Sequence, residues 1–223
     1  MSKSSASKRV AVVLSGCGHK DGAEITEAVS TLIALTEAGA DYEIFAPNAD
    51  FAVTDPITSQ PTSDSRNILR ESARIARGHI RDVKELRADD FDALAFPGGY
   101  GAAVHLCTFA KQGAECTVRP EVERTILSFY QAQKPIAAIC IAPALISKVL
   151  GKRGITVTIG NDPGAAAEIE KTGARHENCA VNDFVTDREH RLVTTPAYMY
   201  DSAKPIEVFT GIRKAIHELV EMA

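Results

Sequence analysis

A cysteine at the end of an apolar run is the side chain with the most chemistry to offer in this sequence. Cys140 directly follows residues 135–139 and precedes a helical pattern that opens at Pro143. A turn from strand to helix places the sulfur near a helix N-terminus, where the helix dipole and free N–H groups favour the thiolate. The backbone N–H of Ile141 is then a candidate oxyanion donor. From position alone, an inert cysteine that acts as a small buried hydrophobe fits equally well.

A pair of glycines offers a second group for the same chemistry. Gly98 and Gly99 follow the apolar run 91–96 and Pro97. Glycines after a strand permit positive φ and leave backbone N–H groups open to a ligand. Gly99 is therefore a second candidate oxyanion donor and Gly98 a candidate pocket residue, although an ordinary turn explains the same pattern.

Two glutamates are candidates for the acid or base that a nucleophilic cysteine needs. Glu24 and Glu27 lie three residues apart at the start of a helical pattern, so they share one helix face. A carboxyl buried near a thiol has a raised pKa and can exchange a proton with it. The alternative is that each is a solvated acid favoured by the helix dipole. The residue pattern leaves the choice between them open.

Other candidate pocket residues lie in loops near these segments. His19 and His105 follow such loops, and Cys17 sits between two glycines. Cys17 is either a second reactive thiol or part of a tight turn. The remaining histidines have no evident companion in the sequence; they are His79, His176, His190 and His217.

Hydrophobic patterning predicts the elements that must position these residues. Short apolar runs indicate strands, helical periodicity separates them, and Gly39 ends the first helix. This alternation predicts an α/β fold, a three-layer sandwich with a mostly parallel central sheet and helices on both faces. The predicted strands are residues 9–14, 42–46, 91–96, 135–139 and 155–159, with an antiparallel pair at 184–185 and 192–195; the helices are 23–38, 71–77, 121–133, 143–149 and 205–221.

Parallel strands bring distant loops to one edge of such a sheet. Ligands bind beyond the carboxyl ends of the strands, so residues 16–18, 97–99 and 140–141 are expected to share one rim. Residues 48–66, rich in Asp, Ser, Thr and Pro, are expected to form a long surface excursion. The sequence contains no internal repeat or linker, which predicts one domain over residues 9–223 after a disordered lead-in, residues 1–8.

Composition narrows the classes of partner. The 223 residues are 45% hydrophobic and 24% charged, with a net charge of −4 and no Trp, so neither nucleic acid nor an anionic membrane is an expected partner. No apolar run approaches the ~20 residues of a membrane span. Residues 1–8 lack the apolar core of a secretory signal. The five cysteines are scattered without metal-ligand spacing, which favours free thiols, no metal, and the cytoplasm.

Several strings together resemble the ThiJ/PfpI superfamily, whose members have a class I glutamine amidotransferase-like, flavodoxin-like fold. The resemblance covers nearly the whole chain. It rests on residues 22–27, 96–99 and 138–143. Longer strings at residues 14–18, 71–78, 140–143 and 194–199 are similar to the ElbB-type glyoxalase branch, also called the sigma cross-reacting protein branch.

The resemblance implies a role for each candidate. Cys140 becomes the nucleophile, Glu27 rather than Glu24 its acid/base partner, and Gly99 and Ile141 the oxyanion donors. Two departures weigh against peptidase or amidase chemistry. Protease-like relatives carry His after the cysteine, where this chain has Ile141, and others carry a histidine where this chain reads residues 160–162, Gly-Asn-Asp.

The expected activity is that of a glyoxalase III-type lyase, reported in some relatives as a deglycase. Glyoxal or methylglyoxal, a small aldehyde substrate, would become the 2-hydroxy acid through a cysteine hemithioacetal, with no cofactor and in a homodimer. An alternative is a redox-sensing or stress-linked binding protein that uses an oxidisable Cys140. A third, glutamine-dependent amidotransfer, needs the histidine that is missing.

Overall fold

The structure, a computed structural model, describes residues 7–223 and is built on a seven-stranded sheet. Residues 1–6, most of the expected lead-in, lie outside the described residues. The strand order is β10-β11-β7-β6-β1-β2-β5, and only β10 runs antiparallel to its neighbour. The strands are β1 (Arg9–Val13), β2 (Asp41–Ala46), β5 (Ile80–Asp82), β6 (Ala93–Phe96), β7 (Ile136–Ile139), β10 (Val185–Asp187) and β11 (Leu192–Thr195).

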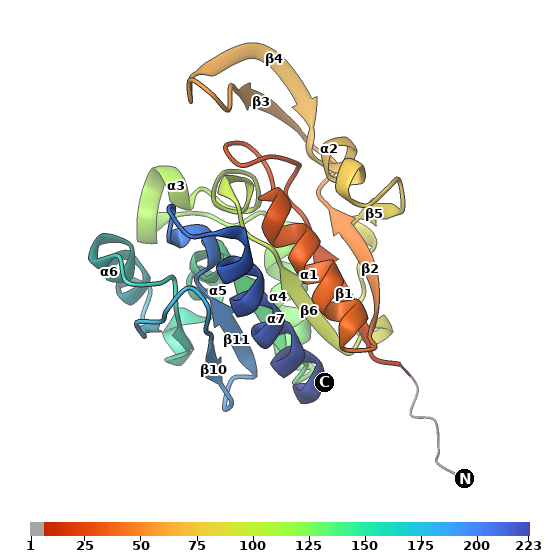
Figure 1. The fold of residues 1–223 in the computed structure, drawn as a ribbon, viewed down its shortest axis with the longest axis vertical. Coiled ribbons are helices and arrows are strands. Elements are labelled where there is room, and N and C mark those ends of the chain that lie inside the picture. Colours follow the sequence, from red (N-terminus) through yellow and green to blue (C-terminus); the bar gives the residue numbers. More distant parts are fainter. Residues whose placement is uncertain (1–6) are drawn as a thin grey trace.

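Helices cover both faces of this sheet. One face carries α1 (Ile25–Glu37) and α7 (Pro205–Met222), which pack side by side; the other carries α4 (Pro120–Gln131) and α5 (Ala142–Leu150) (Figure 1). A short α2 (Ile68–Ile75) precedes β5. The predicted flavodoxin-like α/β architecture is therefore confirmed, including the antiparallel pair formed by β10 and β11.

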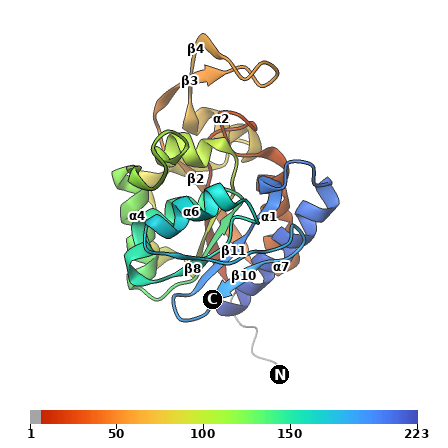
Figure 2. The same ribbon diagram turned by 90° about the vertical axis from the view of Figure 1, so that its left-hand side faces the viewer.

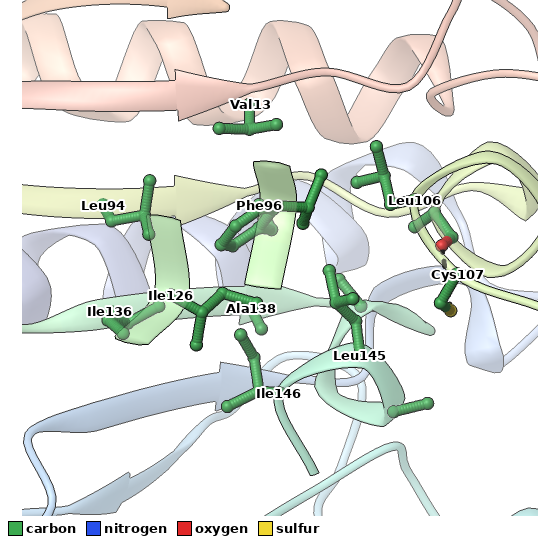
Figure 3. Close-up of a cluster of buried hydrophobic side chains, with 14 of the residues drawn as sticks. Val13, Leu94, Phe96, Leu106, Cys107, Ile126, Ile136, Ala138, Leu145 and Ile146 are labelled. Atoms are coloured by element: carbon green, nitrogen blue, oxygen red, sulfur yellow. Dashed lines mark hydrogen bonds between the residues drawn. The ribbon is translucent and has the colours of Figure 1, made fainter. Parts of the chain in front are cut away.

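The central strands are apolar throughout because both of their faces are buried. In β6, Leu94 and Phe96 point toward α4 and α5, while the small Ala93 and Ala95 point toward the α1 and α7 side. Figure 3 shows part of the first cluster, where side chains from the strands meet those of the covering helices. This packing fixes the carboxyl ends of β1, β6 and β7 side by side.

The expected strand at residues 155–159 is not part of the central sheet, and that prediction was wrong. Only β8 (Thr156–Val157) forms, and it pairs with β9 (Arg175–His176) in a separate two-stranded sheet. The N–H of Thr156 donates to the Asp187 carboxylate at 2.7 Å, and the N–H of Thr158 donates to the Thr194 hydroxyl at 2.9 Å. These backbone N–H groups are thus bonded to side chains and are not available to pair with a strand of the central sheet.

The excursion at residues 48–66 contains more order than its composition indicates. A hairpin of β3 (Asp50–Thr54) and β4 (Pro61–Asn67) stands away from the sheet in two perpendicular views (Figures 1 and 2). The short β5, β9, α3 (Phe109–Gln112) and α6 (Pro163–Lys171) were not predicted either. No helix within the described residues combines the length and apolar character needed to cross a membrane.

Candidate active site

Cys140 occupies a strained turn at the end of a central strand. Its N–H donates to the carbonyl of Thr195 at 2.9 Å, which extends the pairing of β7 with β11 by one residue. Its φ is then +61°, in the left-handed region that costs about 1–2 kcal/mol for a residue with a Cβ. Helix α5 begins two residues later at Ala142. The turn between strand and helix predicted for this cysteine is present, and its side chain is 6% exposed.

The glycine pair at the end of β6 makes room for this cysteine. A Cβ at Gly98 would lie 2.4 Å from the Cβ of Cys140 and 2.7 Å from Oε2 of Glu27. Gly99 has φ +96°, and a Cβ there would lie 2.3 Å from the backbone nitrogen of Glu24. Glycine is therefore required at both positions, and the carboxylate and the thiol approach each other over the bare backbone of Gly98.

The structure separates the two glutamates that the sequence left as alternatives. Glu24 is the N-cap of α1, and its Oε2 accepts a hydrogen bond from the N–H of Glu27 at 2.8 Å. Glu27 lies in the first turn, with a side chain that is 0% exposed. Its Oε1 accepts the N–H of Tyr198 at 3.1 Å. Its Oε2 is buried, has no hydrogen-bond partner within residues 7–223, and faces the corner formed by Gly98 and Cys140.

Burial is the main reason that Cys140 and Glu27 hold their protons. Burial, with an added contribution from the charge of Glu24, raises the pKa of Glu27 to about 8, although the N–H of Tyr198 opposes the shift. Burial, followed by the nearby Glu27 charge, raises the pKa of Cys140 well above its usual value. Two groups that repel as anions in a dry site do not both ionise near neutrality. The pair therefore retains at least one proton, and the two groups can exchange it.

Two backbone N–H groups face the sulfur. Gly99 and Ile141 both contact Cys140 through the backbone, and each contact lowers the pKa of the thiol. These are the two amides predicted as oxyanion donors. In this structure they are placed to stabilise negative charge that develops on the sulfur or on an atom bonded to it.

The sulfur opens into a cavity of about 580 Å³. Gly99, Ile141 and Cys140 line it, together with residues that the sequence analysis did not single out: Lys20, Tyr100, Ala103, Phe109, Ala110, Lys111, Gly113, Glu168, Tyr198, Met199 and Asp201. Tyr198 has a double role, because its backbone N–H also fixes Glu27. It belongs to the string at residues 194–199 that carried part of the resemblance, which was the one available signal for it.

Three candidate pocket residues lie elsewhere. Cys17 does not line the cavity, and burial and the nearby Glu71 raise its pKa. His105 Nε2 hydrogen-bonds to the carbonyl of Asp21 at 2.8 Å, and its ring packs on Phe51. The exposed His19 contacts the edge of the Tyr100 ring from outside. These loops do share a rim, but Cys17 lies near α2, His105 packs on the hairpin and His19 is exposed to solvent. Within the described chain, no histidine lines the cavity.

Comparison with known proteins identifies the class to which this fold and site belong. Residues 8–202 match the DJ-1/PfpI family, and the chain is a member of that family. It is 44% identical over 225 aligned positions to the human glutamine amidotransferase-like class 1 domain-containing protein 3, mitochondrial, covering 96% of this chain and 83% of that protein.

Solved structures agree with this assignment. A crystal structure of an isoprenoid biosynthesis protein with an amidotransferase-like domain from Ehrlichia chaffeensis superposes with a TM-score of 0.89 at 36% identity, covering 96% of this chain and 100% of that one. Glyoxalase III from Candida albicans gives a TM-score of 0.61 at 15% identity, covering 94% and 95% of the two chains. At that identity the second comparison shows a shared fold only.

Proposed function

We propose that this protein is a cofactor-independent enzyme of the glyoxalase type, which converts a 2-oxoaldehyde such as glyoxal or methylglyoxal to the corresponding 2-hydroxy acid. The observation that carries the proposal is the buried pair of Cys140 and Glu27. A thiol, one carboxyl that titrates near neutrality and two backbone N–H groups supply a nucleophile, an acid/base and charge stabilisation at one place.

The reaction begins when the pair has lost one proton. Cys140 adds to the aldehyde carbon as the thiolate, and the proton held by Glu27 passes to the carbonyl oxygen, which gives a neutral hemithioacetal. The N–H groups of Gly99 and Ile141 stabilise the negative charge as it leaves the sulfur. Because the proton moves inside a dry site, no ion has to be solvated by water at this step.

Glu27 then acts as a base. Its carboxylate removes the hydrogen from the former aldehyde carbon, and the proton is delivered to the adjacent carbon through an enediol, leaving a thioester on Cys140. Water hydrolyses the thioester to the 2-hydroxy acid and restores the thiol. The hydrogen bond from Tyr198 holds Oε1 in place, so Oε2 is the oxygen free to carry the proton.

The test is to supply purified protein with glyoxal and to measure glycolate formation. Cys140→Ala should abolish turnover, because no other thiol lines the cavity among the described residues. Cys17→Ala is the matched control, a cysteine at the same rim but outside the cavity, and should retain wild-type turnover. Equal glycolate formation by wild type and Cys140→Ala would refute the proposal.

The redox-sensing alternative makes a different prediction for the same residue. Oxidation-prone cysteines are those with thiolate character, whereas burial and the nearby charge of Glu27 raise the pKa of Cys140. Selective oxidation of Cys140 by mild peroxide, together with no aldehyde turnover, would favour the sensor. Amidotransfer lacks support because it requires a histidine at the thiol.

A further inference from the structure

A second pair of cysteines lies in the segment that forms one wall of the cavity. Cys107 and Cys116 are separated by eight residues, and both are buried, at 3% and 1% exposure. Figure 3 shows Cys107 at the edge of the apolar cluster, next to Leu106. Four of the eight intervening residues line the cavity; they are Phe109, Ala110, Lys111 and Gly113.

The backbone brings the two cysteines together across a narrow hairpin. Cys107 forms an antiparallel bridge with Val118. Beyond it, the N–H of Thr108 donates to the carbonyl of Thr117 at 3.0 Å, and the N–H of Thr117 donates to the Thr108 hydroxyl at 2.9 Å. These bonds close the base of the loop and set Cys107 opposite Val118. Cys116 lies two residues before Val118 on the facing segment, so its side chain emerges on the same side as Cys107, diagonally across the base.

The side chains complete this arrangement. The neighbouring Cys116 thiol, followed by burial, raises the pKa of Cys107. The Cys107 thiol, followed by the positive charge of Lys148, lowers the pKa of Cys116 to about 7. Lys148 is held in place by a 2.8 Å hydrogen bond to the carbonyl of Ala114. Cys107 also donates to the carbonyl of Ala102 at 3.4 Å. One sulfur therefore has a nearby cation and a thiol donor, as a reactive thiolate requires.

We propose that Cys107 and Cys116 are a redox-active thiol pair that a peroxide converts to an intramolecular disulfide, and that this bond ties down the wall of the cavity. The proposal concerns neither Cys140 nor aldehyde turnover, so it stands or falls independently of the proposed function. The two thiols influence each other in the folded protein, and their sulfurs must close to about 2.05 Å for the bond to form.

The chemistry balances with hydrogen peroxide as the oxidant. The Cys116 thiolate attacks one peroxide oxygen and becomes a sulfenic acid, and the departing hydroxide takes up a proton to form water. The Cys107 sulfur then attacks the Cys116 sulfur and displaces hydroxide, which accepts the Cys107 proton and leaves as a second water. Two thiols and one peroxide thus give one disulfide and two waters, and a thiol reductant reverses the change.

The disulfide would restrain the cavity wall because it closes the loop that contains α3. In the reduced protein, the residues between the cysteines are held by the hairpin bonds at its base, by the turn of α3 and by the hydrogen bond from the N–H of Ala114 to Glu168. A covalent link at the base removes the open conformations in which those hydrogen bonds break. We therefore expect slower opening of residues 108–115 after oxidation.

The experiment uses the full-length protein treated with limiting hydrogen peroxide, alkylated and digested with trypsin. Cleavage after Lys111 separates the cysteines into two peptides, so the disulfide appears as a cross-linked pair that has lost two hydrogen atoms and that a reductant splits. Cys107→Ser should abolish the cross-link and leave Cys116 as the oxidised residue. Cys179→Ser, at a thiol outside the loop, should leave the cross-link unchanged.

Hydrogen exchange of residues 108–115 provides the second readout. It should slow severalfold in the oxidised wild type and be unaffected by peroxide in Cys107→Ser. The proposal would be overturned if Cys107 and Cys116 could still be fully alkylated after peroxide had oxidised the other thiols. A cross-link without slower exchange would overturn its second half, the restraint of the wall.

Discussion

The two cysteine sites differ in the groups around the sulfur. Cys140 lines the cavity, whereas Cys107 and Cys116 lie at the ends of a segment that forms one of its walls. Cys140 lies beside the carboxyl group of Glu27. Burial raises the pKa of both groups, and the charge of Glu27 raises that of Cys140 further. Cys116 lies beside a second thiol and Lys148, which lower its pKa to about 7. The same side chain is thus fitted to proton-coupled addition at one site and to oxidation at the other. The comparison teaches that burial and the neighbouring side chains together decide what a thiol in this protein can do.

The largest expected effect is that of removing the ionisable group beside Cys140. Glu27→Gln should lower kcat/KM for glyoxal by roughly 10²–10⁴-fold, the usual contribution of a positioned acid/base. Glu24→Gln is the matched control: its amide oxygen can still cap α1, and turnover should stay close to that of the wild type. Peroxide cross-linking of Cys107 with Cys116 should be unaffected by either change. If kcat/KM of Glu27→Gln stayed within threefold of the wild-type value, Glu27 would not be the acid/base of the Cys140 site.

The value of kcat/KM should also depend on the protonation state of Cys140 and Glu27, and therefore on pH. The reacting form has lost one proton, and the pKa of Glu27 is raised to about 8. Below that value, kcat/KM should fall about tenfold per pH unit, and above it the rate should level off. A profile that is flat from pH 6 to pH 9 would contradict this assignment. Peroxide cross-linking, in contrast, should begin near pH 7, because the Cys107 thiol and Lys148 lower the pKa of Cys116 to about 7.

The buried carboxyl should make folding pH-dependent. The pKa of Glu27 in the folded protein, about 8, exceeds the ordinary value of 4.5. The contribution of Glu27 to the free energy of unfolding is therefore fully present below pH 4.5 and is lost as the pH rises through 8. Within this window the free energy of unfolding should fall by up to about 1.4 kcal/mol per pH unit. Urea denaturation at pH 5.5 and 7.5 measures it. The difference between wild type and Glu27→Gln isolates this group, and equal slopes would contradict its burial as an acid.

The smallest expected effect is on stability, and it comes from the different backbone conformations at Cys140 and Cys107. Cys140→Gly should be more stable than Cys140→Ala by about 1 kcal/mol, because only glycine adopts φ +61° without strain. Cys107 has φ −146°, so Cys107→Gly should instead be less stable than Cys107→Ala by about 0.5–1 kcal/mol. Denaturation midpoints of the four variants test the reversal. A Cys140→Gly variant that is less stable than Cys140→Ala would show that the turn at Cys140 stores no strain.

Part of this site was predictable because its residues adjoin the strongest sequence signals. Cys140 directly follows one apolar strand and Gly99 lies three residues after another, and parallel strands bring their carboxyl ends to one edge of a sheet. The choice of Glu27 came from the resemblance. The structure supplies the physical reason: the Glu24 side chain caps the N-terminus of α1, while Glu27 is buried.

What the residue pattern did not predict depends on contacts between distant segments. The strand expected at residues 155–159 failed because the side chains of Asp187 and Thr194 bind its N–H groups. Cys17, His19 and His105 follow loops at the correct rim, yet which way a loop side chain turns depends on what packs against it. Nothing in the chain's periodicity signalled that Tyr198 would reach across to hold Glu27.

The sequence by itself determined the alternation of strands and helices and, through it, the rim that carries Cys140, because burial on both faces of a strand leaves a local imprint on residue types. Only the tertiary structure decided the electrostatics of the two thiols. Cys107 and Cys116 look unrelated along the chain, and Cys140 looks like a thiol activated by a helix N-terminus. The pKa of Cys140 instead follows from burial and from Glu27, and the pKa of Cys116 from the Cys107 thiol and Lys148. Folding brings these groups together, and no local pattern encodes them.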